Sequence, residues 1–508
     1  MKEYDLISIG TGSAMGIIDA MISQNPNMKV AVIDKDEPGG ICLTRGCIPS
    51  KILLYPAELV RLIEEAKELG IDTSIKKIDF KNIMERMRKI INKDIEMIRQ
   101  GLSHSPNIDY YPKKAEFVAP YTVKVGEETI SANMIFLCTG SKPIIPKIKG
   151  LEKAGYLTSD TILKISDLPE SVAIIGGGYI AAEFGHFLAA MGSKVTIIGR
   201  NKKFLPSEEP EISILAKKVL EKNMTIITSH EVQEVNSVKG KKKLTAINRE
   251  NGKKKIVTSD EILVAAGRGS NSDILHPNLA GIETDEKGWI ITNEYLETSQ
   301  PGIWALGDAN GKYLFKHVAN FESMIVYYNS VLNRQVSMNY RAIPHAVFTY
   351  PEIASVGIKE NEAIQRYGKD GVLVGIQRYE DTAKGEAMAV KDYFVKVIVE
   401  KNSRKILGAH IIGPYASILI QEIVNIMYTP AQNIDPITNG MHIHPALNEV
   451  IERAFRNLMS PENYHHVIEH EYKLVTSKEE IVTRKCPNCG RELSSNATYC
   501  DKCGSKTQ

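Results

Sequence analysis

The chain has 508 residues, enough for two to four domains with substantial cores. Its 63 Lys and Arg nearly balance its 61 Asp and Glu, so no overall charge favours nucleic acid or a membrane surface as the main partner. No secretory signal or apolar stretch of membrane-spanning length is visible, and seven cysteines, four of them in C-x-x-C pairs, suit a reducing compartment. We therefore expect a cytoplasmic protein with a small substrate and no membrane partner.

The N-terminal segment has the pattern of a βαβ dinucleotide fold. A short apolar run leads into G-T-G-S at residues 10–13, then a helical stretch and a second apolar run that ends at Asp34. Gly10 permits the tight turn, Gly12 lets the backbone approach a pyrophosphate at the helix N-terminus, and Asp34 can bond ribose hydroxyls. Met15 stands where the third glycine is expected, which leaves the packing of helix on strand open at that point.

Two cysteines, Cys42 and Cys47, lie five positions apart among glycines and are followed by Lys51. A disulfide needs Cα atoms within roughly 4.4 to 6.8 Å, whereas positions i and i+5 of a regular helix are about 8.6 Å apart. We therefore expect Cys42 in an entering or distorted first turn and Cys47 near a helix N-terminus, where the dipole and Lys51 favour the thiolate. Two buried hydrophobic cysteines are the alternative. Cys138 fits that description, whereas the glycines and the lysine favour a redox pair at Cys42 and Cys47.

The segment G-G-I-C-L-T-R-G-C-I-P-S-K, residues 39–51, resembles the active-site disulfide of the pyridine nucleotide-disulfide oxidoreductases. This family includes dihydrolipoamide dehydrogenase, glutathione reductase, mycothione reductase and mercuric reductase. The resemblance extends to about residue 460 and implies a redox-active Cys42–Cys47 disulfide, FAD, a nicotinamide cofactor and a homodimer. Within the family, G-T-G-S is more similar to the first loop of mycothione reductases than to that of dihydrolipoamide dehydrogenases.

Three later segments are similar to parts of the family that surround the flavin: residues 134–141, residues 262–268 and residues 298–308. The resemblance implies that Asp308 binds the ribityl chain of FAD. It also implies that His317, in L-F-K-H-V-A-N, lies near the flavin. A simply packed histidine is the alternative for His317. The residues predicted to bind on the FAD side are Gly10, Gly12, Ser13, Asp34, Lys51, Thr139, Gly140, Gly267, Gly307, Asp308 and His317.

A second fingerprint, residues 171–181, is followed by the strand K-V-T-I-I-G-R, residues 194–200. Two such motifs predict two nucleotides. An NAD enzyme usually carries an acid at the end of this strand, but Gly199 and Arg200 stand here, which favours the 2′-phosphate of NADP. A solvated turn is the alternative, and Pro206 stands where glutathione reductases carry a second arginine. The residues predicted to bind on the nicotinamide side are Gly176, Gly178, Tyr179, Ala181 and Arg200.

The resemblance also assigns roles at the reaction centre. Tyr179 gates the nicotinamide pocket, and Glu183 pairs with Lys51 beside the flavin N5. Cys47 stays against the flavin, while Cys42 lies nearer the substrate entrance and attacks a small disulfide.

A histidine and a glutamate near the C-terminal end of the resemblance complete this mechanism. In M-H-I-H-P-A-L-N-E, residues 441–449, the resemblance makes His444 the general base that reaches the disulfide of the other subunit, and Glu449 the residue that orients its imidazole. His442 is the competing candidate, but the His-Pro context and the spacing to Glu449 favour His444.

The C-terminal tail carries two C-x-x-C pairs ten residues apart, each followed by glycine. Four thiolates at this spacing predict a closed, structural, tetrahedral Zn²⁺ site that folds around its metal. Such a ribbon could bind a protein or nucleic acid, or act only as a stabilising cap. The predicted ligands are Cys486, Cys489, Cys500 and Cys503.

We predict an α/β fold with two Rossmann-like dinucleotide-binding domains, an α+β dimerisation domain and a small zinc ribbon. The predicted enzyme passes electrons between NAD or NADP, FAD, the cysteine pair and a small thiol or disulfide, as dihydrolipoamide dehydrogenase does. The alternatives are an NADPH-dependent reductase of a low-molecular-weight disulfide and a redox-sensing flavoprotein recruited through its ribbon. The predicted domains are FAD-binding, 1–145 and 266–335; NAD(P)-binding, 146–265; interface, 336–463; linker, 464–485; and ribbon, 486–504.

Overall fold

The structure, a computed structural model, describes residues 1–474, 483–485 and 492–494. The chain divides into two compact units. In the part of the chain that is described, no helix is both long and apolar enough to cross a lipid bilayer. Unit 1 consists of Met1–Leu62, Ser74–Arg200 and Met224–Tyr340, and unit 2 consists of Ile63–Thr73, Asn201–Asn223 and Arg341–Gln508.

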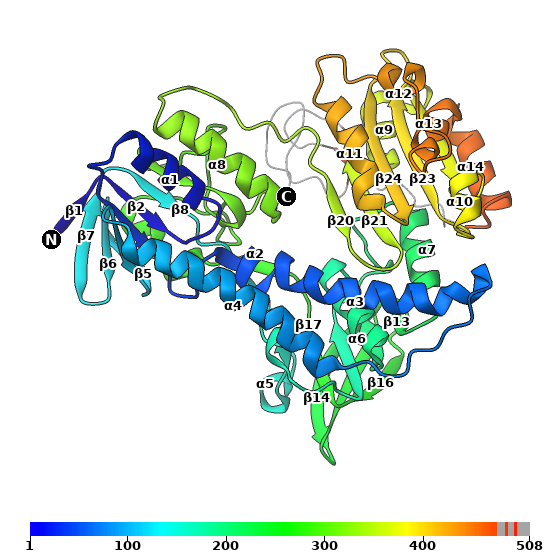
Figure 1. The fold of residues 1–508 in the computed structure, drawn as a ribbon, viewed down its shortest axis with the longest axis horizontal. Coiled ribbons are helices and arrows are strands. Elements are labelled where there is room, and N and C mark those ends of the chain that lie inside the picture. The colour runs from blue at the N-terminus through cyan, green and yellow to red at the C-terminus, as the bar shows by residue number, and fades with distance from the viewer. Residues whose placement is uncertain (475–482, 486–491, 495–508) are drawn as a thin grey trace. The chain divides into compact units, whose positions relative to one another are not determined.

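The first parallel sheet of unit 1 is formed by the apolar runs of the sequence. Its central strands are buried on both faces, which explains their nearly continuous Val, Ile and Leu content. Helices α1 (Met15–Gln24) and α8 (Lys316–Ser330) lie side by side although they are far apart in the sequence (Figure 1). In sheet order the strands are β19 (Ile303–Ala305), β8 (Ile135–Leu137), β2 (Leu6–Ile9), β3 (Val30–Ile33) and β4 (Ile108–Tyr111).

The second parallel sheet of unit 1 repeats the same arrangement. Helix α6 (Tyr179–Met191) connects two neighbouring parallel strands, β11 and β12, as the second fingerprint predicts. In sheet order the strands are β10 (Leu157–Thr158), β17 (Glu261–Val264), β11 (Ser171–Ile175), β12 (Lys194–Ile198) and β13 (Thr225–Ile227). An antiparallel sheet follows with β14 (His230–Val238), β15 (Lys241–Asn248) and β16 (Lys254–Ser259).

Further elements complete unit 1. The long helix α4 (Phe80–His104) begins at Asp79, whose carboxylate accepts a hydrogen bond from the Asn82 backbone N–H at 3.1 Å, and it buries an apolar stripe. The others are α2 (Gly40–Arg45), α3 (Cys47–Glu65), α5 (Leu151–Ala154), the sheet β1 (Lys2–Tyr4), β7 (Glu128–Ala132), β6 (Thr122–Val125) and β5 (Ala115–Ala119), and the pair β9 (Ser141–Pro143) and β18 (Arg268–Ser270). Helix α3 continues into the first residues of unit 2.

Unit 2 is built on an antiparallel sheet with helices, in agreement with the predicted α+β domain. In sheet order its strands are β20 (His345–Val347), β21 (Glu352–Gly357), β24 (Ile406–Gly413), β23 (Phe394–Glu400), β22 (Val372–Arg378) and β25 (Leu458–Met459). Its helices are α7 (Pro210–Leu220), α9 (Glu360–Tyr367), α10 (Ala383–Ala387), α11 (Ala416–Met427), α12 (Asp435–Asn439), α13 (Glu449–Arg456) and α14 (Pro461–His470).

The linker predicted from residue 464 is wrong over its first residues, because they lie in α14. Tyr464 and Ile468 are buried, and the Tyr464 hydroxyl donates a hydrogen bond to Glu211. Glu211 is also 2.6 Å from the fully buried ammonium of Lys396. Tyr464 and Ile468 are four positions apart and therefore lie on one face of the helix. Because the residues around them are mostly polar or charged, this spacing is hard to recognise in the sequence.

The predicted zinc ligands Cys486, Cys489, Cys500 and Cys503 lie outside the described residues. Two short strands of the same region are described: β26 (Thr483–Lys485) pairs antiparallel with β27 (Glu492–Ser494).

Candidate active site

The cysteine segment packs directly on the first dinucleotide loop. Gly10 has φ +112°, and a Cβ there would lie 2.2 Å from the carbonyl oxygen of Cys138, so a side chain is excluded. A Cβ on Gly40 would lie 2.8 Å from the Cα of Gly12, which shows how closely the two loops approach. In the part of the chain that the structure describes, no atom lies within 4 Å of the Cβ position of Gly12, which leaves its backbone accessible to a diphosphate.

Asp34 follows β3 and fixes the same loop. Its Oδ2 accepts hydrogen bonds from the Thr11 backbone N–H at 3.0 Å and from the Thr11 hydroxyl at 2.5 Å. Met15, which stands in place of the third glycine, is only partly buried. Ala14 and Ile17 are the buried residues at the start of α1, so the helix packs without a glycine at position 15.

The helix is interrupted between the two cysteines, as the spacing predicts. Cys42 lies in the short helix α2, Gly46 breaks the path with φ −132° and ψ −118°, and Cys47 is the first residue of α3. Both are free thiols in the structure. The Cys42 thiol donates a hydrogen bond to Cys47, which, together with the charge of Lys51, lowers the pKa of Cys47 to about 7. The same hydrogen bond and burial raise the pKa of Cys42. The arrangement separates a thiolate at Cys47 from a neutral thiol at Cys42.

This difference predicts the pH dependence of the reduced protein. Lowering the pKa of a thiol favours its charged form, so the Cys47 thiolate should be present above a pH of about 7 and be lost below it. Titration of the thiolate-to-flavin absorbance band of the reduced holoprotein measures this midpoint. In Cys42→Ala, which removes the S–H donor, the midpoint should move upward. A wild-type midpoint near 9.0, the ordinary thiol value, would contradict the assignment.

A carboxylate–ammonium pair lies one helical turn beyond Cys47. The Nζ of Lys51 is 2.9 and 2.8 Å from the two carboxylate oxygens of Glu183. This pairing agrees with the one implied by the family resemblance and joins α3 to α6. Tyr179, the first residue of α6, lies one turn before Glu183, and burial raises the pKa of its hydroxyl. Cys47 and Lys51 are four positions apart on α3, and Tyr179 and Glu183 are four positions apart on α6. Each pair therefore lies on one face of its helix.

The residues predicted for FAD fit such a group. Among the described residues, the hydroxyl oxygen of Thr139 is buried without a hydrogen-bond partner, which is unusual for a buried polar atom and leaves it available to a ligand. Asp308 accepts a hydrogen bond from Ser141, and burial raises the pKa of its carboxyl group. Gly140, Gly267 and Gly307 all have positive φ, between 64° and 114°, where side chains are disfavoured.

Glu322 is a residue that sequence analysis did not single out. It is fully buried in α8, and its carboxylate accepts hydrogen bonds from the Gly307 backbone N–H at 2.5 Å and from the Asn310 amide at 3.0 Å. Glu322 therefore holds the short segment that carries Asp308. An isolated acid in an amphipathic helix gives no sequence signal of this role.

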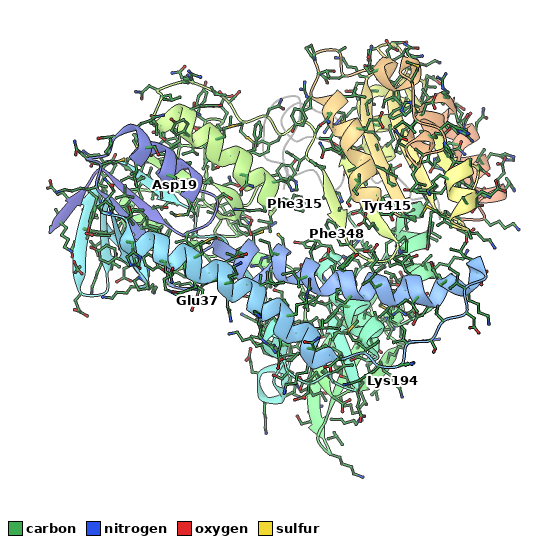
Figure 2. The ribbon with its side chains drawn as sticks, in the orientation of Figure 1. Asp19, Glu37, Lys194, Phe315, Phe348 and Tyr415 are labelled. Carbon is green, nitrogen blue, oxygen red and sulfur yellow. The ribbon has the colours of Figure 1, made fainter. Side chains whose placement is uncertain are left out.

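The segments G-T-G-S and K-H-V-A-N contact each other. The Ser13 hydroxyl accepts a hydrogen bond from the Lys316 ammonium at 2.8 Å and donates one to the Asn320 side-chain oxygen at 3.0 Å. Figure 2 shows Phe315 at the N-terminal end of α8, where its ring stacks on that of His317 with centroids 5.3 Å apart. Lys316 was also missed by sequence analysis, because its partner Ser13 is 303 residues away.

The nicotinamide side has the same close glycine packing. A Cβ on Gly176 would lie 2.1 Å from the carbonyl oxygen of Ala265, and Gly178 has open space at its Cβ position. Ala181 is fully buried inside α6. Arg200 follows β12 and is exposed.

The two candidate histidines of unit 2 differ sharply in exposure. The Nδ1 of His444 is 2.9 Å from Glu449 Oε1, and the His444 side chain is 67% exposed. This hydrogen bond lowers the pKa of Glu449. The His442 side chain is only 7% exposed and its Nε2 lies 3.1 Å from Glu422. His444 therefore has the exposed, carboxylate-oriented imidazole that a general base needs.

Family models match most of the chain. The model described as pyridine nucleotide-disulphide oxidoreductase matches residues 4–325, and the model of the dimerisation domain of the same family matches residues 343–455. The chain belongs to the pyridine nucleotide-disulphide oxidoreductases. A zinc-ribbon domain model matches residues 485–507.

Similar proteins share this architecture. Mycothione reductase of Mycobacterium tuberculosis (strain ATCC 25618 / H37Rv) is 34% identical over 470 residues, which cover 90% of this chain and 100% of that protein. Dihydrolipoyl dehydrogenase of Chlamydia muridarum is 32% identical, covering 88% of this chain and 95% of that protein. The structure of the HOCl-induced flavoprotein disulfide reductase RclA from Escherichia coli, solved as a Cu(II) complex, superposes with a TM-score of 0.79 at 26% identity, covering 90% and 99% of the two chains.

This pyridine nucleotide-disulphide oxidoreductase is accordingly a flavin-dependent enzyme of the α/β fold predicted from its sequence. Its family uses FAD and NAD(P)H, and the match to the dimerisation domain supports a homodimer. When bound, FAD supplies a hydride acceptor that can pass an electron pair to a disulfide. In unit 1 the two cysteines, the Lys51–Glu183 pair and the two dinucleotide loops are the predicted residues for this chemistry.

Proposed function

We propose that this enzyme uses NADPH to reduce a low-molecular-weight disulfide. The observation that carries the choice of nucleotide is the end of β12, where Gly199 and the exposed Arg200 replace the acid that would bond an NAD ribose. Mycothione reductase among its relatives supports the substrate class. The overall reaction takes one NADPH, one proton and one disulfide to NADP⁺ and two thiols. A reducing cytoplasm as its location is part of the proposal and rests on the cysteine content.

The cysteines carry the electron pair to the substrate in this proposal. Reduction opens the Cys42–Cys47 disulfide and leaves a thiolate at Cys47, which its lowered pKa favours. Cys42 then attacks one sulfur of the substrate disulfide, forming a mixed disulfide and releasing the first thiol. The Cys47 thiolate attacks the Cys42 sulfur of the mixed disulfide and restores the enzyme disulfide, and the second substrate thiolate that it releases takes up the one proton of the overall reaction.

Two further pairs of residues assist this transfer, one by moving a proton and one by its charge. His444, oriented by Glu449, takes the proton of Cys42 and gives it to the first leaving thiolate, acting on the partner subunit as the family resemblance implies. The positive charge of Lys51 lowers the pKa of Cys47 and so stabilises its thiolate, while Glu183, 2.8 Å from the Lys51 ammonium, holds that ammonium in place.

The zinc ribbon is proposed to hold a structural Zn²⁺ through Cys486, Cys489, Cys500 and Cys503. Its support is the ligand spacing and the zinc-ribbon match over residues 485–507. Four protein ligands leave no open position for catalysis, so a docking or stabilising role is proposed for the ribbon.

Anaerobic titration of the yellow holoprotein tests the proposal. We expect rapid loss of flavin absorbance with NADPH and slow loss with NADH, followed by reoxidation on adding a small disulfide from a panel. Preference for NADH with efficient turnover of lipoamide would instead establish a dihydrolipoamide dehydrogenase. Reduction by NADPH without reoxidation by any disulfide would remove the proposed substrate class while leaving the nucleotide assignment intact.

A further inference from the structure

We infer that Arg249, on the loop after β15, reads the 2′-phosphate of NADPH together with Arg200. This inference rests on the NADPH preference proposed above and adds a residue to it. The sequence shows no second arginine shortly after Arg200, because Pro206 stands at the position where glutathione reductases carry one. The structure brings a second guanidinium to the same place from a segment 49 residues further along the chain.

The end of β12 is fixed next to the second dinucleotide loop. The Gly176 backbone N–H donates to the Ile198 carbonyl at 3.0 Å, and a Cβ on Gly199 would lie 3.4 Å from the Cα of Gly177. In this class of fold the residue at this strand end faces the adenosine ribose, so Arg200 stands at the position that distinguishes a 2′-hydroxyl from a 2′-phosphate.

Arg249 reaches that position from a hydrogen-bonded loop. Its backbone N–H donates to the Ser229 carbonyl at 2.7 Å, and the His230 backbone N–H donates to the Gly199 carbonyl at 3.0 Å, which ties the loop to the end of β12. One guanidinium N–H of Arg249 donates to the Arg200 carbonyl oxygen at 3.3 Å. The side chain of Arg249 is 54% exposed, so it is accessible from solvent.

The surrounding acids leave this guanidinium available. Glu231 forms only a long ion pair with Arg249, with 4.0 Å between its Oε2 and the Arg249 Nε, which is beyond hydrogen-bond distance. The Glu250 carboxylate accepts a hydrogen bond from Ser229 at 3.0 Å. Because a guanidinium has five N–H donors and only one is used by the Arg200 carbonyl, Arg249 retains the paired donors that bind a phosphate.

The test compares nucleotides that differ only in the 2′-phosphate. Binding of 2′,5′-ADP and of 5′-AMP to the holoprotein is measured by calorimetry, and the rate of flavin reduction is measured with NADPH and with NADH. For Arg249→Gln we expect about ten-fold weaker binding of 2′,5′-ADP and about ten-fold slower reduction at low NADPH, with 5′-AMP and NADH unchanged. Arg200→Gln should act in the same direction.

Lys255→Gln is the matched control, since it removes one exposed positive charge from the neighbouring strand β16 and should leave all four measurements unchanged. Equal losses for both nucleotides in Arg249→Gln, or no loss at all, would overturn the inference. So would a wild-type protein that binds 2′,5′-ADP no more tightly than 5′-AMP. None of these measurements uses a disulfide. Their results therefore stay valid even if no small disulfide reoxidises the enzyme, and the two failures can be told apart.

Discussion

Replacing Cys47 with Ser is expected to abolish the thiolate-to-flavin absorbance band and to reduce disulfide turnover by about 10³-fold or more, because the variant can neither form the internal disulfide nor resolve the mixed disulfide. Cys47 is the first residue of α3 and has the lowered pKa of the pair. It is therefore the thiol that carries the negative charge.

Cys42→Ser should give the opposite spectrum with the same loss of turnover. A serine hydroxyl can still donate a hydrogen bond to Cys47, but it cannot form a disulfide. The Cys47 thiolate should then be present without any reduction, so the band should appear in the protein as purified. The two variants together separate the charge-bearing thiol from the attacking thiol.

Cys138→Ala is the matched control for these two variants. Cys138 is partly buried beneath the first dinucleotide loop, and burial raises the pKa of its thiol to about 12. Its removal should leave both the band and disulfide turnover in place. Persistence of the band in Cys47→Ser, or its absence in Cys42→Ser at a pH well above 7, would show that the assignment of the thiolate to Cys47 is wrong.

The parts of the site that the sequence predicts are those fixed by local geometry. The break in the helix between Cys42 and Cys47 follows from helix dimensions. The need for glycine at position 10 follows from the tight turn, which leaves no room for a side chain. The pairing of Lys51 with Glu183 was available only through the family resemblance, because the two residues are 132 positions apart.

The parts that the sequence does not predict depend on tertiary contacts between polar residues. Glu322 supports the segment of Asp308 from inside a helix, and Arg249 reaches the end of β12 from another sheet. Both look like ordinary surface charges in the sequence, and nothing in their spacing marks them. The same holds for Tyr464, whose charged neighbours led to a predicted linker where the chain forms α14. The contacts of these polar groups are decided by partners that are distant in the sequence.

His444→Gln should slow reoxidation by a disulfide by about 10²- to 10⁴-fold while leaving the reduction of the flavin by NADPH unchanged. His444 pairs with Glu449 within unit 2, whereas the cysteines and both dinucleotide loops belong to unit 1. Separate measurement of the two half-reactions distinguishes this loss from a general defect. Glu449→Gln keeps the hydrogen bond but removes the charge, so it should cause a smaller loss in the same half-reaction.

His442→Gln is the control that separates the two neighbouring histidines. His442 is nearly buried beside Glu422, so its replacement should change the stability of unit 2 more than the rate of the folded enzyme. A large, selective loss of reoxidation in His442→Gln, with His444→Gln near wild type, would reverse the assignment.

The proposed action across the dimer has its own test, in which His444→Gln and Cys42→Ser subunits carry different tags and are expressed together. A mixed dimer then has one site with an intact cysteine pair facing an intact His444 and one site with neither. Random assembly makes half of the dimers mixed, so about a quarter of wild-type turnover should return if His444 serves the partner subunit. If His444 acted on its own subunit, every site in the mixture would lack one group and turnover would stay at the level of the single variants. The recovery therefore depends on a catalytic site that is shared between two chains.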